Sequence, residues 1–184
     1  MWTALWVFIS ALAVALIAPM IAHAIKLSEF RQAWINDLRK DIAEYVGLSR
    51  RWARNYETYF DLTRNNTSEE ILREKEEEVT SLINEARVIE WRIQMRINPL
   101  ESATKQQDDL FLEAIANLTT REKILPEQSG AVDRWNDLAD VAISRSRELL
   151  KREWEVTKQF LPRWLQLLRK RLKIFAGSRL QKTP

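Results

Sequence analysis

The residues best suited to specific chemistry are a group of cations close to the C-terminus. The stretch from Pro162 to Lys182 carries seven Lys and Arg residues and no Asp or Glu. Side chains of this kind bind phosphate oxygens, whether these belong to nucleic acid or to anionic lipid headgroups. The stretch therefore indicates an anion-binding surface, and the apolar residues among the cations indicate which anion to expect.

Apolar residues recur within this basic segment at steps of three or four, the spacing of one face of a helix. Such a face can enter the acyl boundary of a bilayer while the cations meet the headgroups. We therefore predict that residues 162–184 form a basic amphipathic helix on the membrane surface. Its predicted contact residues are Arg163, Trp164, Leu168, Arg169, Lys170, Arg171, Leu172, Lys173 and Phe175.

Two alternatives stay open for this segment. Its apolar face could instead pack on a helical bundle, with the charges outside. The cations could also bind nucleic acid, an alternative that is less favoured because phosphate binding does not require a continuous apolar face.

Residue sets for catalysis or metal binding are missing from the sequence. His23 is the only histidine and there is no cysteine, so neither a Ser-His-Asp triad nor a thiolate zinc site is available. Glu74, Glu76, Glu77 and Glu78 are nearly consecutive, so on a helix they radiate into solvent and do not converge on a metal. We therefore predict a protein that is not an enzyme and has no cofactor; a small-molecule ligand is not expected.

The composition is typical of long helices. The 184 residues include only 3 Gly and 5 Pro, too few for a turn-rich sheet protein. The net charge is +3: residues 163–184 contribute +7, and the preceding 162 residues contribute −4. The expected fold class is all-α, with an N-terminal transmembrane helix followed by an antiparallel, coiled-coil-like bundle of long helices.

Residues 1–25 give the clearest signal of a membrane anchor. From Trp2 to Ile25 there is no Asp, Glu, Lys or Arg, and this length of helix, at about 1.5 Å per residue, crosses a hydrocarbon core of about 30 Å. Trp2 and Trp6 suit one headgroup boundary, Lys26 suits the other, and Pro19 lies near the end of the span where a kink is tolerated. We predict a single transmembrane helix.

The charges that follow the apolar run predict its orientation. Lys26, Arg31, Arg39 and Lys40 come after it, which by the positive-inside rule places the N-terminus outside and the remaining chain in the cytoplasm, at the inner membrane. A cleaved signal peptide is the alternative, because Ala22–Ala24 reads Ala-His-Ala, the small-x-small form of a cleavage site.

We predict that residues 26–161 form a cytoplasmic bundle of four helices, at about 28–60, 68–98, 100–122 and 131–161. The connections between these helices are short, which favours antiparallel neighbours. Apolar residues alternate at steps of three and four, the heptad spacing of packed helices. Gly47 predicts a bend or break in the first helix. The predicted packing seam comprises Ile35, Leu38, Ile42, Tyr45, Trp52, Leu72, Val79, Leu82, Ile89 and Ile93.

Outside this seam, the packing face of the third helix is expected to carry Gln107, Leu110 and Ala114. The packing face of the fourth helix is expected to carry Trp135, Ala142 and Val156. The tryptophans at helical positions are expected in the core, because buried aromatic rings contribute large apolar areas. These are Trp34, Trp52, Trp91, Trp135, Trp154 and Trp164.

Two segments resemble a known family. "SEFRQAWIN", which directly follows the apolar run, and "RINPLESATKQQDDL", which contains the Asn98-Pro99 break, are similar to a family of small bacterial and prophage membrane-anchored helical proteins without an assigned activity. The resemblance implies a one-pass anchor, a helical cytoplasmic hairpin and a phage- or defence-associated context.

These observations together predict a membrane-anchored interaction or scaffold protein, whose partners are the lipid bilayer and either another protein or a second copy of the chain. A membrane-perturbing effector is the alternative from another functional class, and nucleic-acid binding through the basic helix is a third.

Overall fold

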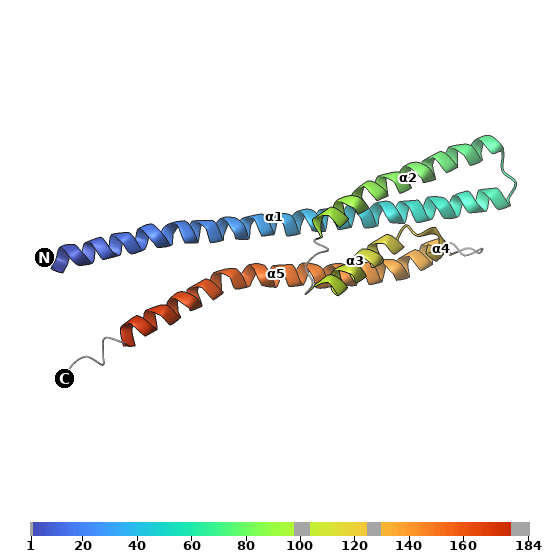
Figure 1. The fold of residues 1–184 in the computed structure, drawn as a ribbon. Helices are drawn as coiled ribbons and strands as arrows, with labels where there is room; N and C mark the ends of the chain where they lie inside the picture. Colours follow the sequence, from blue (N-terminus) through green and yellow to red (C-terminus); the bar gives the residue numbers. More distant parts are fainter. Residues whose placement is uncertain (1, 98–103, 125–129, 178–184) are drawn as a thin grey trace. The chain divides into compact units, whose positions relative to one another are not determined.

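The structure, a computed structural model, describes residues 2–97, 104–124 and 130–177, with side chains at most positions up to residue 157. All its regular elements are helices: α1 (Trp2–Arg64), α2 (Glu69–Arg96), α3 (Lys105–Asn117), the single-turn α4 (Arg121–Ile124) and α5 (Ala131–Gly177). Over these residues the predicted all-α class and helical bundle are confirmed (Figure 1).

The chain divides into two compact units. Unit 1 combines Met1–Ile35 with Arg152–Pro184, and unit 2, which we call the core unit, is Asn36–Lys151. The core unit contains the second half of α1, then α2, α3, α4 and the first part of α5.

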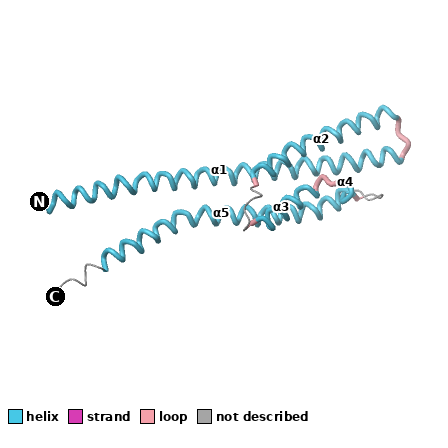
Figure 2. Tube along the Cα trace, in the orientation of Figure 1, coloured by secondary structure: helices cyan, strands magenta, loops and turns pink. Residues whose placement is uncertain are grey.

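Within the core unit, α1 and α2 form an antiparallel hairpin that turns at residues 65–68 (Figure 2). Polar contacts fix its direction, because Asp41 bonds to Arg96 near the end of α2 while Asn55 bonds to Lys75 near its beginning. Asn66 has a φ of 51°, the left-handed conformation that asparagine tolerates in tight turns.

The predicted seam of this hairpin lies largely in the core. Buried side chains follow heptad steps on both helices, and their burial removes apolar surface from water along the whole seam. They include Ile35, Leu38, Ile42, Tyr45 and Trp52 on α1, and Val79, Leu82, Ile89 and Ile93 on α2. Leu72, near the start of α2, is half-buried.

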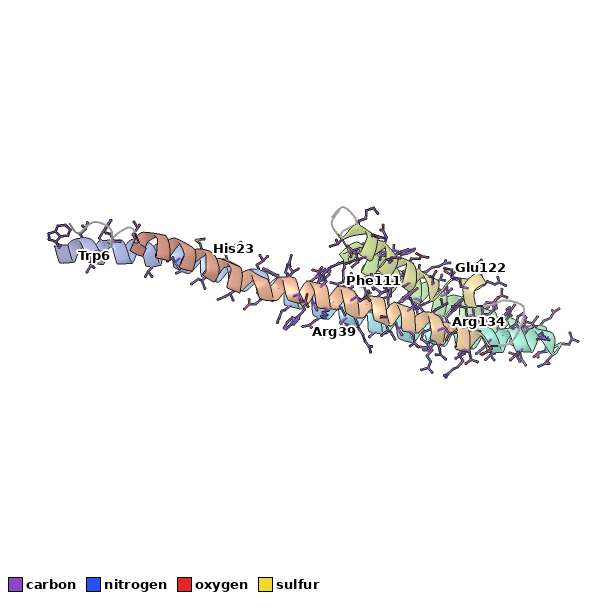
Figure 3. The ribbon with its side chains drawn as sticks, turned by 90° about the horizontal axis from the view of Figure 1, so that it is seen from below. Trp6, His23, Arg39, Phe111, Glu122 and Arg134 are labelled. Atoms are coloured by element: carbon purple, nitrogen blue, oxygen red, sulfur yellow. The ribbon has the colours of Figure 1, made fainter. Side chains whose placement is uncertain are left out.

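The buried face of α3 differs from the expected one. Leu110 is 39% exposed and Gln107 is also exposed, whereas Phe111, labelled in Figure 3, is 1% exposed and Ile115 is fully buried. Ala114 is buried as expected, so the prediction was wrong for Leu110 and Gln107 only. Burying Phe111 and Ile115 removes more apolar surface from water than burying Leu110 and Gln107.

Helix boundaries differ from the expected ones in three places. Residues 1–25 and 28–60 were expected as separate helices, but α1 is continuous from Trp2 to Arg64, through Pro19 and Gly47. The range 100–122 holds α3 and α4, separated by a turn at residues 118–120. Helix α5 runs through residue 162 without ending there. Helix α1 therefore has no break at Gly47.

Candidate functional site

Three features of the chain bear on function: a row of buried polar groups on α1 in the core unit, the exposed apolar part of α1, and the basic part of α5. None of the predicted site residues belongs to the first feature except Tyr45. The polar row begins at Asp41, which is 3% exposed although it is ionisable.

Asp41 is held by two arginines of α2. Its Oδ1 accepts a hydrogen bond from Arg92 at 3.1 Å, and its Oδ2 accepts one from Arg96 Nε at 2.8 Å. Arg96 also reaches Asp37 on the surface at 3.4 Å. A buried carboxylate is tolerated only when it is paired in this way, so the contact fixes the register of α1 against α2.

Tyr45 lies one turn further along α1 and joins three segments. Its fully buried hydroxyl is 3.1 Å from the carbonyl oxygen of Ile115 and 3.0 Å from the Thr119 hydroxyl, at the end of α3 and in the turn that follows. Glu90 Oε2 of α2 is 3.5 Å from the same hydroxyl. We call Tyr45, Glu90, Ile115 and Thr119 the Tyr45 cluster.

Burial dominates the acid-base properties of this cluster. Removal from water raises the pKa of the Tyr45 phenol well above its ordinary value, while the bond with Thr119 lowers that pKa and the nearby Glu90 charge raises it. Burial also raises the pKa of the Glu90 carboxyl, against the lowering effects of Tyr45 and Arg87. Both groups are therefore held toward their neutral forms.

The polar row continues toward the start of α5. Ser49 accepts a hydrogen bond from the indole of Trp135 at 3.2 Å, and donates one to the carbonyl of Val46. Glu57, at the end of the row, is half-buried, and its Oε1 accepts bonds from the backbone N–H groups of Gly130 at 2.9 Å and Ala131 at 3.2 Å. A side chain of α1 thus caps the N-terminus of α5, where free N–H groups and the helix dipole favour a negative charge.

The sequence carried a signal for part of this row. Asp41 directly precedes the seam residue Ile42, and Arg92 and Arg96 are four residues apart on the helix that pairs with it. An antiparallel register places these opposite charges together. The role of Glu57 had no such signal, because the backbone N–H groups that donate to it, at the start of α5, are more than 70 residues away in the chain.

The second feature is the exposed apolar surface at the start of α1, where Figure 3 labels Trp6 and His23. Leu5, Trp6, Val7, Phe8 and Ile9 are all exposed, and successive residues of a helix point about 100° apart. Apolar side chains therefore surround the helix here. Trp2, Leu12, Val14, Met20, Ile21 and Ile25 are exposed as well.

Among the residues that the structure describes, no helix combines the length and the apolarity needed to span a bilayer. This finding does not support the predicted transmembrane helix at 1–25. The helical conformation of α1 extends over Trp2, Trp6, Pro19 and Lys26, the residues assigned to the anchor.

The third feature is the basic part of α5. The helical backbone extends to Gly177. The side chains predicted to contact a membrane, from Arg163 to Phe175, lie outside the described side chains. Trp164, which was also expected in the core, is one of them.

The tryptophans are not uniformly in the core. Trp52 and Trp135 are buried and Trp34 is half-buried, but Trp91 is 57% exposed and Trp154 is 39% exposed. Trp91 falls between Ile89 and Ile93, so it points away from the buried side of α2. The expectation of a core position was wrong for these two residues.

In the described part of the chain, no three or more His, Cys, Asp or Glu side chains gather in a way that could hold a metal ion. Comparison with known proteins gives no match: no family model, no curated protein and no solved structure matches this chain. The fold and the site define the chain as an all-α helical bundle with a row of polar groups along α1. The resemblance to prophage membrane proteins stays a prediction.

Proposed function

We propose that the chain is a membrane-anchored helical interaction protein without catalytic activity. In this proposal the start of α1 inserts into the cytoplasmic membrane, and the core unit presents a helical surface to a protein partner on the cytoplasmic side. The C-terminal part of α5 adds a second, weaker contact with anionic lipid.

The observation that carries the proposal is the apolar surface around the start of α1. A helix that is apolar all round is stable only when protein or lipid covers it. Trp2 is 78% exposed, and Phe8 and Val14 are each 66% exposed, so the described residues of this chain leave that surface largely open to solvent. The absence of charge from Trp2 to Ile25 favours lipid as the cover.

Two further features support this proposal. Lys26, Arg39 and Lys40 follow the apolar segment and are exposed, as expected for the cytoplasmic end of an anchor. Residues 2–35 and 152–177 also belong to the same compact unit, and in this proposal one membrane surface serves both.

Membrane fractionation of a bacterium that expresses the full chain tests the anchor. We expect the chain to stay with the membrane after carbonate extraction, and a variant that lacks residues 2–25 to move to the soluble fraction. A reporter fused to the C-terminus should be active on the cytoplasmic side. Release of the full chain by carbonate would contradict the anchor, and an external C-terminus would contradict its orientation.

The same strains separate the interaction protein from a membrane-perturbing effector. An interaction protein leaves the membrane potential unchanged when its expression is induced, whereas an effector depolarises the cells in a manner that depends on residues 2–25. Retention of the variant without residues 2–25 on duplex DNA at moderate salt would instead favour nucleic-acid binding by the basic helix.

A further inference from the structure

Helix α2 carries a second apolar stripe on the side opposite its buried seam. Val88, Trp91 and Met95 follow one another at steps of three and four, and their exposed fractions are 52%, 57% and 79%. Asn84, one turn earlier, is exposed on the same side of the helix. We call these four residues the Trp91 face. Tryptophan and methionine are enriched at the centres of protein interfaces, so the Trp91 face has the composition of a contact surface.

The seam of α2 is not available to a second chain, because helices of the same chain already cover it. Ile89 is 4% exposed and Ile93 is fully buried. These two residues lie on the side of α2 that points away from the Trp91 face. A contact of α2 with another molecule therefore has to use the Trp91 face.

Polar residues of both signs of charge border the Trp91 face. Glu85 and Arg92 lie along one edge, two helical turns apart, and Arg87 and Gln94 lie along the other edge. All four are exposed. Arg92 bonds to Asp41 through Nη1, yet its side chain is still 44% exposed, so it can contact a second carboxylate as well.

A second copy of α2 covers this face when the two helices run antiparallel. A two-fold axis at the level between residues 89 and 90 places Val88 beside Trp91 of the second copy. The same axis places Asn84 beside Met95 of the second copy. The facing stripes then pack over about three helical turns, and each copy contributes the same residues, as in an isologous dimer.

This axis also brings opposite charges together. Two-fold symmetry keeps like edges side by side, so Glu85 lies beside Arg92 of the second copy, offset by only about 3 Å along the helix axis. On the other edge, Arg87 lies beside Gln94 of the second copy, whose amide oxygen accepts hydrogen bonds from a guanidinium. A parallel pair would instead set the edge of Arg87 against the edge of Arg92, which are like charges. The charges therefore favour the antiparallel pair.

We propose that the Trp91 face is an interface between two copies of this chain, in which α2 packs antiparallel against α2. The proposal rests on the interaction role proposed above, for which it names the partner, but it does not depend on the membrane anchor. A contact over about three turns is at the low end of specific interfaces, so we expect a dissociation constant on the order of 10 μM.

Sedimentation velocity of the full-length protein in mild detergent tests the pairing. Between about 1 and about 100 μM we expect a reversible monomer–dimer equilibrium. Val88→Glu places a charge inside the pair and should raise the dissociation constant at least about tenfold. Val141→Glu is the matched control, because Val141 on α5 is also 52% exposed, and it should dimerise as the natural protein does. A dimer that Val88→Glu leaves intact, or an equal loss in both variants, would overturn the proposal.

Glu85→Arg tests the contact along the edge. This change sets an arginine beside Arg92 of the second copy, so the dissociation constant should rise about fivefold at low salt and by less at high salt. Glu76→Arg changes the net charge equally on an exposed position of α2 outside the paired turns, and it should dimerise normally. An equal effect of the two variants would mean that net charge is the cause, and would contradict the proposed register.

Single cysteines give the direction of the pair, because the natural chain has none. Position 84 faces position 95 of the second copy, whereas each position lies about 17 Å along the axis from its own counterpart. Under mild oxidation we therefore expect a disulfide-linked dimer only when Asn84→Cys and Met95→Cys are mixed. Dimers of either variant alone would indicate a parallel pair and overturn the proposal.

A different protein is the other occupant that the experiment distinguishes. If the natural chain stayed monomeric and Val88→Glu lost a protein that co-purifies with the natural chain, the Trp91 face would serve that protein, and the pairing of copies would be overturned. Carbonate extraction tests the anchor independently, so a monomeric chain would leave that part of the proposed function standing.

Discussion

At the scale of single residues, the core unit depends on a few buried polar groups that each have a defined partner. Asp41, Tyr45 and Ser49 occur at intervals of one helical turn on α1, and each contacts a different element. Apolar contacts in a heptad seam tolerate sliding, whereas a buried ion pair or hydrogen bond fits only one register. These residues therefore specify which of several similar packings the helices adopt.

Asp41→Asn tests the value of the buried ion pair. We expect this change to lower the free energy of unfolding by about 2 kcal/mol, because an amide replaces a carboxylate that accepts charge-assisted bonds from Arg92 and Arg96. Urea denaturation followed by circular dichroism measures the loss. Asp37→Asn is the matched control: its carboxylate is 60% exposed and should contribute less than about 0.5 kcal/mol. Equal losses in both variants would show that burial is not the cause.

At the scale of elements, the length of α1 is the main departure from the sequence-based picture. A glycine costs a helix about 1 kcal/mol relative to alanine, and Gly47 was expected to bend or break it. The helix stays intact because Tyr45, Ser49 and Trp52 on either side of Gly47 are buried. Tertiary packing thus outweighs a local preference of this size.

Gly47→Ala should therefore stabilise the protein. An added Cβ at Gly47 meets nothing within 4 Å, so the variant gains helix propensity without a clash, and the free energy of unfolding should rise by about 1 kcal/mol. Gly130→Ala provides the contrast, because Gly130 has a φ of 106° that side chains rarely adopt, and it should destabilise. Thermal unfolding of both variants would decide, and a lower midpoint for Gly47→Ala would mean that the helix needs flexibility there.

At the scale of the whole molecule, the two compact units differ in what covers their apolar residues. In the core unit, the seam of α1 is covered by other helices of the same chain. In unit 1, the apolar residues at the start of α1 are exposed. Folding and localisation should therefore respond to different substitutions.

Val14→Lys separates these two properties. A charge near the middle of an inserted helix costs about 3 kcal/mol, so we expect a clear fall in the carbonate-resistant membrane fraction. Val14 lies outside the core unit and is 66% exposed, so the urea midpoint should not change measurably. Val14→Leu is the control and should retain the natural distribution. A change in the urea midpoint for Val14→Lys would show that the start of α1 supports the core.

The sequence by itself determined the helical class, most of the α1–α2 seam and the uncharged run at the N-terminus, because hydrophobic period and composition are local properties. Only the tertiary structure decided which face of α3 is buried, that Trp91 is exposed, and that Glu57 and Glu90 meet partners on other helices. Such contacts join residues that are 45 to 74 positions apart, as in Tyr45 with Glu90 and Thr119. Periodicity along one helix contains no information about its rotation against another, and that rotation depends on the side chains of all the helices packed together.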